Sequence, residues 1–119
     1  MVLLVDDDED VRESIADLLR GRGYFVATAA DGHAALRAIA AEDLPCIVLL
    51  DLVMPGMDGW QFVGVVQADP RMSAIPIVIA SAHAATHAPT GTAGVLHKPF
   101  ELDELFAVVE EHCGPATAA

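Results

Sequence analysis

Five short apolar runs mark the chain, and longer segments separate them. Apolar runs of this length, bounded by turn residues, are typical of strands that are buried on both faces. Because segments with helical spacing alternate with the runs, we predict an α/β fold with a doubly wound five-stranded parallel sheet, right-handed crossovers and helices on both faces. The predicted strands are Met1–Val5, Tyr24–Thr28, Cys46–Leu50, Ile75–Ala80 and Gly94–His97.

Three of the segments between the runs, and the segment after the last run, place apolar residues on one side of a helix. Asp8, Glu9 and Asp10 suit the start of the first helix, Asp31 should cap the second over about 32–41, and Gly114 should end the last. The residues predicted to face the core are Val11, Ile15, Leu18 and Leu19 in the first helix, Ala35, Leu36 and Ile39 in the second, Phe62, Val63 and Val66 in the third, and Leu102, Leu105, Val108 and Val109 in the last. Trp60 is predicted to be a half-buried anchor of the third helix.

The connection between the fourth and fifth strands is the exception, because its helix is expected to be short or missing. It has only residues 82–92, which is close to the minimum of about 10–12 residues for a crossover with a helix. Pro89 blocks helix continuation, Gly91 weakens it, and the apolar side chains in the segment are alanines. We expect at most one or two helical turns, around 83–88.

Length and composition indicate one compact domain. A chain of 119 residues with 54% hydrophobic content can bury a single core and is not disordered. We assign residues 1–114 to the domain and 115–119 to a tail or the start of a linker. No basic leader precedes the first strand, and the longest stretch without charged side chains, 72–97, contains prolines and histidines. Neither a signal peptide nor a membrane span is therefore expected.

The net charge argues against one class of binding partner, and the cysteines indicate a cellular location. Eighteen acidic against six basic residues give a formal net charge of −12, a field that repels phosphate backbones and argues against direct nucleic-acid binding. Cys46 lies in a predicted strand and Cys113 at a helix end, and together they form neither a disulfide framework nor a zinc pattern. This use of cysteine favours a reducing, cytoplasmic location.

Polar side chains follow four of the apolar runs directly. The pair Asp6-Asp7 comes after the first run, Asp51 after the third, Ser81 after the fourth and Lys98 after the fifth. Because ligands of open parallel sheets bind beyond the carboxyl ends of the strands, we expect these residues to converge in space. The sequence therefore predicts an acidic phosphate site at that edge.

These residues, in this order, carry a resemblance to a known family. The segments VLLVDDDED (2–10), LLDLVMPGMDGW (49–60), IVIAS (77–81) and HKPF (97–100) resemble the receiver domain of bacterial two-component response regulators, of the chemotaxis-regulator type. The resemblance covers essentially the whole chain and implies a flavodoxin-like sheet of strand order 2-1-3-4-5. It also implies a phosphoacceptor switch rather than an enzyme, served by a partner histidine kinase or phosphotransfer protein and possibly by an output domain in a longer chain.

The resemblance assigns a role to each site residue. Asp51 would be the phosphoacceptor, Asp6 and Asp7 metal-binding acids, Ser81 the switch hydroxyl and Lys98 a cation for a phosphoryl oxygen. A cis peptide bond between Lys98 and Pro99 is implied as well.

Phosphoryl transfer to a carboxylate requires neutralisation of charge on both partners, and Mg²⁺ suits a set of oxygen ligands. We expect Asp7, Asp51 and the backbone carbonyl of Val53 to bind Mg²⁺ directly, and Asp6 to bind it through a water. Before phosphorylation, Lys98 should form an ion pair with Asp51.

Two features depart from the family pattern. Val95 stands where an aromatic residue is common, three positions before the lysine. Val53 and His83, each two positions after a site residue, should tune how long the phosphoryl group persists.

Two alternative functions fit parts of this pattern. A non-switching interaction scaffold with this fold would fit the missing aromatic residue, but the complete set of acids and lysine argues against it. A phosphohydrolase similar to the haloacid dehalogenase group would need a second acid two positions after the nucleophile, where this chain has Val53.

Overall fold

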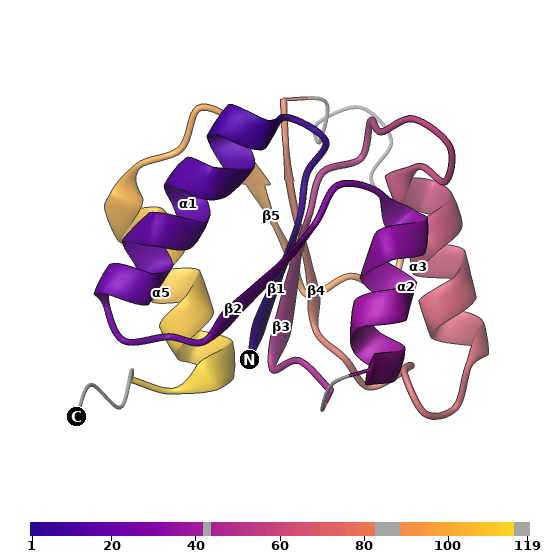
Figure 1. Cartoon of the computed structure of the whole chain (residues 1–119). Coiled ribbons are helices and arrows are strands. Elements are labelled where there is room, and N and C mark those ends of the chain that lie inside the picture. Colours follow the sequence, from indigo (N-terminus) through magenta and orange to yellow (C-terminus); the bar gives the residue numbers. More distant parts are fainter. Residues whose placement is uncertain (42–43, 83–88, 116–119) are drawn as a thin grey trace.

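The computed structural model describes residues 1–41, 44–82 and 89–115, and it shows one parallel sheet with strand order β2-β1-β3-β4-β5 (Figure 1). This order is the one that the sequence predicted. The elements are β1 (Val2–Val5), α1 (Glu9–Gly21), β2 (Val26–Ala29), α2 (Gly32–Ala41), β3 (Ile47–Leu50), α3 (Gly59–Ala68), β4 (Ile77–Ser81), β5 (Gly94–His97) and α5 (Leu102–Cys113).

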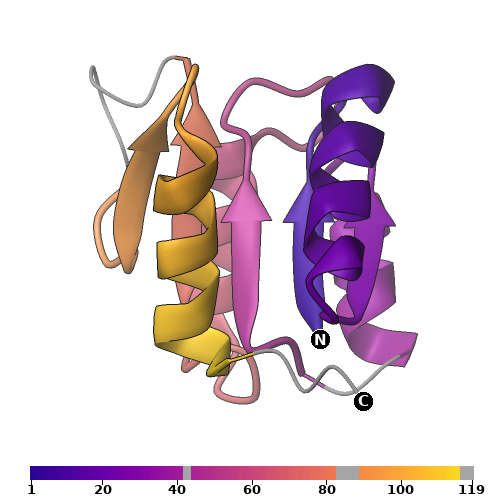
Figure 2. The ribbon, with the colours of Figure 1, turned by 90° about the vertical axis from the view of Figure 1, so that its left-hand side faces the viewer.

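Two helical layers cover the sheet, with α1 and α5 on one face and α2 and α3 on the other (Figures 1 and 2). Successive side chains of a strand point to opposite faces, so every central strand must be apolar throughout. In β1, Leu3 and Val5 pack toward α2 and α3, whereas Val2 and Leu4 pack toward α1 and α5. This double burial explains why the strands read as continuous apolar runs rather than as alternating ones.

Side-chain caps fix where the helices begin. The Asp8 carboxylate accepts a hydrogen bond from the Val11 N–H at 3.2 Å, and the Asp31 carboxylate accepts one from the Ala34 N–H at 2.8 Å. Asp58 begins α3 with a reciprocal pair of hydrogen bonds to Gln61. Because each cap satisfies a backbone donor that the helix leaves unpaired, the predicted helix starts are confirmed.

A few predicted core positions are wrong. Leu19 is fully buried, but its neighbour Leu18 keeps 39% of its surface exposed. At about 100° per residue, Leu18 lies roughly 100° from the centre of the buried stripe of α1, which explains its exposure. Leu102, exposed by 47%, stands in the first turn of α5. Trp60, in the first turn of α3, is 38% exposed, which agrees with the half-buried position predicted for it. Strand β2 covers Val26–Ala29, later than the predicted Tyr24–Thr28.

The connection between β4 and β5 shows no helix in its described residues, 82 and 89–93. The predicted helical turns around 83–88 lie outside the described part of the chain. Gly91 has a φ of +81°, and a Cβ atom there would lie 2.4 Å from Nε2 of Gln67. The same Nε2 donates a hydrogen bond to the Thr90 carbonyl at 2.7 Å, so α3 anchors the end of this connection.

The cysteines correct the sequence-based interpretation. Cys46, just before β3, and Cys113, the last residue of α5, form a disulfide that joins positions 67 residues apart. The sequence held no sign of this pairing, because the fold alone brings the start of β3 beside the end of α5. Among the described residues, no helix is long and apolar enough to cross a membrane.

Candidate functional site

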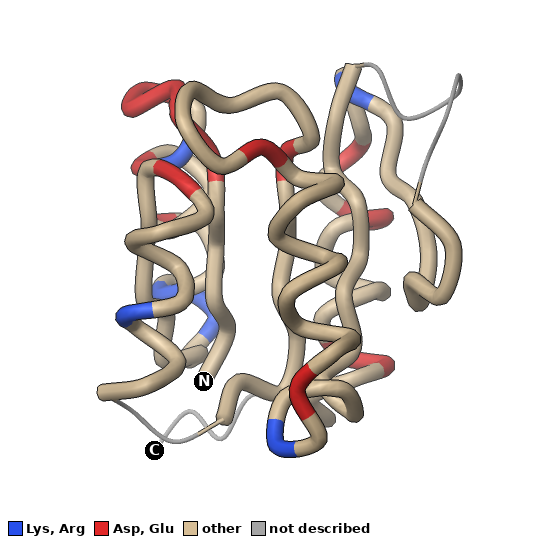
Figure 3. The backbone as a smooth tube through the Cα atoms, turned by 90° about the vertical axis from the view of Figure 1, so that its right-hand side faces the viewer, with Lys and Arg blue, Asp and Glu red and all other residues tan. Residues whose placement is uncertain are grey.

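The strand ends bring the predicted site residues together. Asp6 follows β1, Asp51 follows β3, Ser81 ends β4 and Lys98 follows β5, so all four lie at the carboxyl edge of the sheet. In the backbone trace of Figure 3, several acidic residues (red) lie at that end of the molecule, away from the N-terminus. Carboxylate oxygens of Asp6, Asp7 and Asp51 lie within 4.8 Å of one another. The predicted convergence is therefore found.

Asp6 is the most enclosed of the three acids, with 2% of its surface exposed. Its Oδ1 accepts a hydrogen bond from the Asp8 N–H at 2.9 Å, and its Oδ2 lies 2.5 Å from Nζ of Lys98. The guanidinium of Arg12 donates to the Asp6 backbone carbonyl at 2.9 Å. A buried carboxylate needs such partners, because an unpaired charge in this position would be strongly destabilising.

Lys98 lies closer to Asp6 than the sequence analysis predicted. Its Nζ is 4.0 Å from Oδ2 of Asp51, at the outer limit of an ion pair, and 2.5 Å from Oδ2 of Asp6. The deeper burial of Asp6 explains this preference, because the more desolvated carboxylate gains more from a nearby cation. The Lys98–Pro99 peptide bond is cis, as the resemblance implied.

Asp51 experiences opposing influences, and their sum raises the pKa of its carboxyl group above the ordinary value. Burial is the largest cause of the increase, and the negative charge of Asp6 adds to it. The charge of Lys98, a hydrogen bond from Ser81 and one from the Val53 backbone act in the other direction. The ionised form of Asp51 is therefore under electrostatic stress that a bound cation would relieve.

An open cavity of about 350 Å³ lies over the carboxylates. The loop after β3 forms part of its rim, and the Gly59 N–H closes that loop by donating to the Leu52 carbonyl at 2.8 Å. A Cβ atom on Gly59 would lie 2.7 Å from the Leu52 Cα, so this approach requires glycine. The lining residues are Asp6, Asp7, Asp8, Val11, Asp51, Val53, Ala82 and Lys98.

Three residues of this site were not predicted from the sequence. Val11 and Ala82 line the cavity, and both also border an apolar hollow of about 410 Å³ next to it, together with Pro99 and Phe100. Arg12 supports Asp6 from the second turn of α1. Their side chains carry no signal of their own, since an arginine or a small apolar residue near a strand end is common. His83, predicted to influence phosphoryl lifetime, lies outside the described residues.

Comparison with known sequences identifies a family. A family model for the response regulator receiver domain matches residues 2–110. The response regulator Rre1 from Synechocystis is 35% identical over 113 residues, which cover 91% of this chain and 49% of Rre1. The DNA-binding response regulator MtrA from Mycobacterium tuberculosis is 39% identical over 113 residues, which cover 91% of this chain and 48% of MtrA. The chain thus spans about half the length of these relatives.

Solved structures agree with this result. The response regulator TrrA from Thermotoga maritima, in complex with Mg²⁺ and BeF, matches with a TM-score of 0.81 and 27% identity over 92% of this chain and 96% of its own. The receiver domain of a sensor histidine kinase from Pseudomonas aeruginosa, with magnesium in its active-site cleft, matches with a TM-score of 0.85 and 29% identity over 95% of this chain and 96% of its own. The predicted fold is therefore confirmed.

Proposed function

The chain belongs to the response regulator receiver family, and we propose that it accepts a phosphoryl group on Asp51 from a partner histidine kinase or histidine phosphotransfer protein. The observation that carries this proposal is the placement of the Asp51 carboxylate beside two other carboxylates and a lysine, under an open cavity. In the transfer, a bond forms between an Asp51 oxygen and phosphorus while the bond from phosphorus to the donor's histidine nitrogen breaks.

The donor set fits Mg²⁺. Asp6, Asp7 and Asp51 supply hard oxygen ligands close enough to share one ion, and the backbone carbonyl of Val53, on the cavity rim, would add another. Direct contact would come from Asp7 and Asp51, with Asp6 acting through a water. When bound, the cation neutralises charge on the carboxylates and on the incoming phosphoryl group. The Mg²⁺ reported in two structurally similar proteins supports this assignment.

The remaining residues position and stabilise the phosphoryl group. Lys98, already between Asp6 and Asp51, would bind a phosphoryl oxygen with its ammonium group. Ser81 would donate its hydroxyl to another oxygen and so would respond to the arrival of the phosphoryl group. Because phosphorylation replaces a carboxylate with a more highly charged group, these two contacts are where the modified state would differ from the unmodified one.

The partners follow from the same reasoning. We assign residues 1–114 to the receiver domain and 115–119 to a tail or the start of a linker. An output domain in a longer chain is supported by relatives about twice as long as this chain.

The proposed location is the cytoplasm, where the chain would meet a histidine kinase. Its net charge of −12 opposes direct contact with nucleic acid or a membrane surface. The chain acts as a phosphoacceptor that assists its own phosphorylation and dephosphorylation, not as an enzyme with a separate substrate.

Incubation with Mg²⁺ and acetyl phosphate or phosphoramidate tests the proposal by intact mass. We expect one phosphate per chain in the parent protein and none in Asp51→Asn. Asp58→Asn is the matched control, because Asn also caps a helix and Asp58 lies outside the carboxylate cluster. A parent protein that never gains a phosphate would support the scaffold instead, and continuous turnover of varied phosphate esters would support a phosphohydrolase.

A further inference from the structure

The Cys46–Cys113 disulfide lies at the end of the sheet opposite the proposed phosphorylation site. Cys46 directly precedes β3, and Asp51 directly follows that strand. The four residues of β3 lie between these two positions, and five steps of extended chain span about 16 Å. The disulfide therefore cannot take part in the chemistry at Asp51, and it calls for an explanation of its own.

The last turn of α5 has little else to hold it. The fully buried side chains of α5 are Leu105 and Val109, and no side chain in the turn after Val109 is fully buried. The Tyr24 hydroxyl donates a hydrogen bond to the Gly114 carbonyl at 2.9 Å. The disulfide is a second, covalent attachment of this end of α5, and it joins the helix to the residue that precedes β3. Cleaving it would leave the last turn with its own helical hydrogen bonds, the hydrogen bond from Tyr24 and side chains that are exposed or only partly buried.

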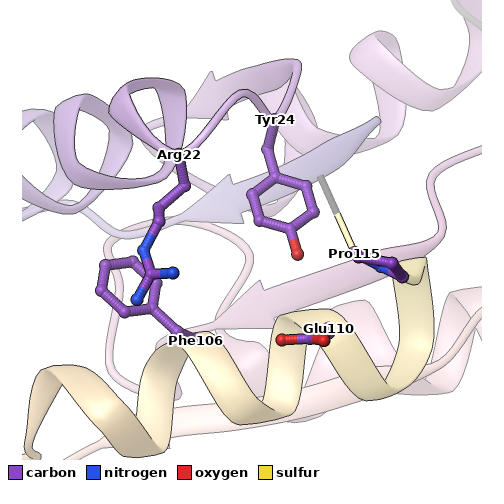
Figure 4. Close-up of a pocket in the computed structure, with 5 residues that line it drawn as sticks. All are labelled: Arg22, Tyr24, Phe106, Glu110 and Pro115. Carbon is purple, nitrogen blue, oxygen red and sulfur yellow. The ribbon is translucent and has the colours of Figure 1, made fainter. Parts of the chain in front are cut away.

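The neighbouring surface is hollow rather than packed. A cavity of about 290 Å³ separates the end of α1 from α5, and its lining residues are Arg22, Tyr24, Phe106, Glu110 and Pro115 (Figure 4). Across this cavity the Arg22 guanidinium lies 4.0 Å from the centre of the Phe106 ring, about two turns before the end of α5. Such an exposed cation–π contact contributes little, so the cavity gives α5 room to move once the disulfide opens.

Both sulfur atoms suit a reversible bond. Cys46 and Cys113 are each only partly buried, so a thiol reagent can approach. The Cys46 sulfur lies 3.3 Å from the Met1 carbonyl oxygen, an acceptor that a thiol can use and a disulfide sulfur cannot. The reduced protein therefore has a ready hydrogen bond for one of its two new thiols. In a reducing compartment, a disulfide of this kind is usually transient and responsive rather than permanent.

We propose that Cys46 and Cys113 form a redox-modification site, a covalent clamp that holds the last turn of α5. Small cellular thiols reduce this disulfide and open the clamp, and the disulfide form of such a thiol oxidises the two cysteines and closes it again. A thiolate of the reductant attacks one sulfur, which forms a mixed disulfide and releases the other cysteine as a thiolate that takes up a proton. A second reductant thiolate then attacks the mixed disulfide and releases the second cysteine. Two electrons pass to the protein, and the two reductant thiols leave as one disulfide.

The clamp and the phosphoacceptor should respond independently. Opening the clamp releases residues 110–115, whereas the carboxylates stay fixed by the opposite ends of the strands. The proposal does not depend on phosphorylation of Asp51, and it predicts a redox response even in a protein that never gains a phosphate.

Titration of the whole chain with reduced and oxidised glutathione, followed by alkylation and intact mass, tests the site. We expect two thiols to appear together at millimolar reduced glutathione. Amide exchange across 110–114 should then accelerate at least tenfold, with little change in β1 or β3. The melting temperature should fall by about 10 °C, because the cross-link closes a long loop. A disulfide that resists millimolar glutathione, or thiols that never pair under oxidising conditions, would overturn the redox site.

Single variants separate the clamp from general destabilisation. Cys113→Ser should reproduce the fast exchange at 110–114 without reductant and should no longer respond to glutathione. Tyr24→Phe, which removes the other attachment of Gly114, should keep the disulfide and should make exchange after reduction faster still. Should Cys113→Ser fail to fold, Cys46→Ser or the reduced parent protein carries the same measurement. Unchanged exchange at 110–114 in the reduced protein would refute the clamp.

Discussion

The two ends of the sheet differ in what holds them together. At the carboxyl edge, three carboxylates and one lysine share a small volume, and the arrangement is stressed until a cation binds. At the other edge, a disulfide and one tyrosine hydrogen bond attach a helix end beside a cavity. The first edge gathers ionised side chains that can bind a cation, whereas the second holds the end of a helix in place. The proposed phosphorylation site and the proposed redox site are therefore separated by the length of one strand.

Removal of Lys98 should have the largest effect on stability at the carboxyl edge. In Lys98→Met the buried Asp6 carboxylate loses its nearest cation, and unfolding free energy should fall by about 3 kcal/mol in the absence of divalent ions. Chemical denaturation with chelator present measures this difference. Adding Asp6→Asn to Lys98→Met should restore most of the loss, since the unpaired charge is then gone. If the double variant is no more stable than the single one, burial of an unpaired charge is the wrong cause.

Mg²⁺ should stabilise the protein by relieving repulsion among the carboxylates. A ligand that binds only the folded state adds about 2.7 kcal/mol at a concentration of 100 times its Kd. Thermal melts with and without Mg²⁺ measure the effect. Asp7→Asn should lose most of it, whereas Asp8→Asn, which keeps a helix cap, should retain it.

The same Mg²⁺ stabilisation should appear in the reduced protein, because the disulfide lies at the other edge. A stabilisation that vanishes on reduction would show that the two edges are coupled.

These two edges also mark what the sequence could predict. Three of the site residues, Asp6, Asp51 and Lys98, directly follow a strand, and Ser81 is the last residue of one. An apolar run and parallel topology therefore sufficed to bring them together. The helix over 32–41 and its Asp31 cap were equally readable, because the signal lies within a few residues.

The opposite edge gave no such signal. The meeting of Cys46 with Cys113 depends on the length and tilt of α5 relative to β3, and neither appears in local patterns. Lys98 lies closer to Asp6 than to Asp51 because Asp6 is more deeply buried, and relative burial is likewise a property of the folded chain. Leu18 shows the same limit within one helix, since a stripe two leucines wide does not say which one faces the core.

The raised pKa of Asp51 predicts a pH-dependent cost to stability. A carboxyl group with a higher pKa in the folded state destabilises the fold as pH rises from the unfolded pKa, about 4, through the folded value. Asp51→Asn mimics the protonated group. Without divalent cations, this variant should therefore melt a few degrees above the parent protein at pH 7, and the gap should close below about pH 3.

Thermal melts from pH 3 to 8 measure this trend, with Asp58→Asn as the control that follows the parent protein. A gap that widens toward low pH would mean that the Asp51 carboxylate is stabilised by its surroundings, contrary to the assigned burial effect. Saturating Mg²⁺ should shrink the gap at pH 7, since the cation stabilises the ionised form of Asp51 in the parent protein.

The smallest effect is expected at Val53, on the rim of the acidic cavity. Half of its surface is exposed, so substitution should hardly change stability, but its branched apolar side chain borders the space through which water would reach the phosphoryl group. Val53→Asn should lose phosphate several-fold faster than the parent protein, because an amide can orient an attacking water. Val53→Ala distinguishes orientation of water by the amide from loss of shielding by the valine side chain. If Val53→Ala also loses phosphate faster than the parent protein, shielding by the valine side chain is the cause. Decay of the phosphorylated mass after removal of the donor gives both rates, and equal rates in all three proteins would show that Val53 does not guard Asp51.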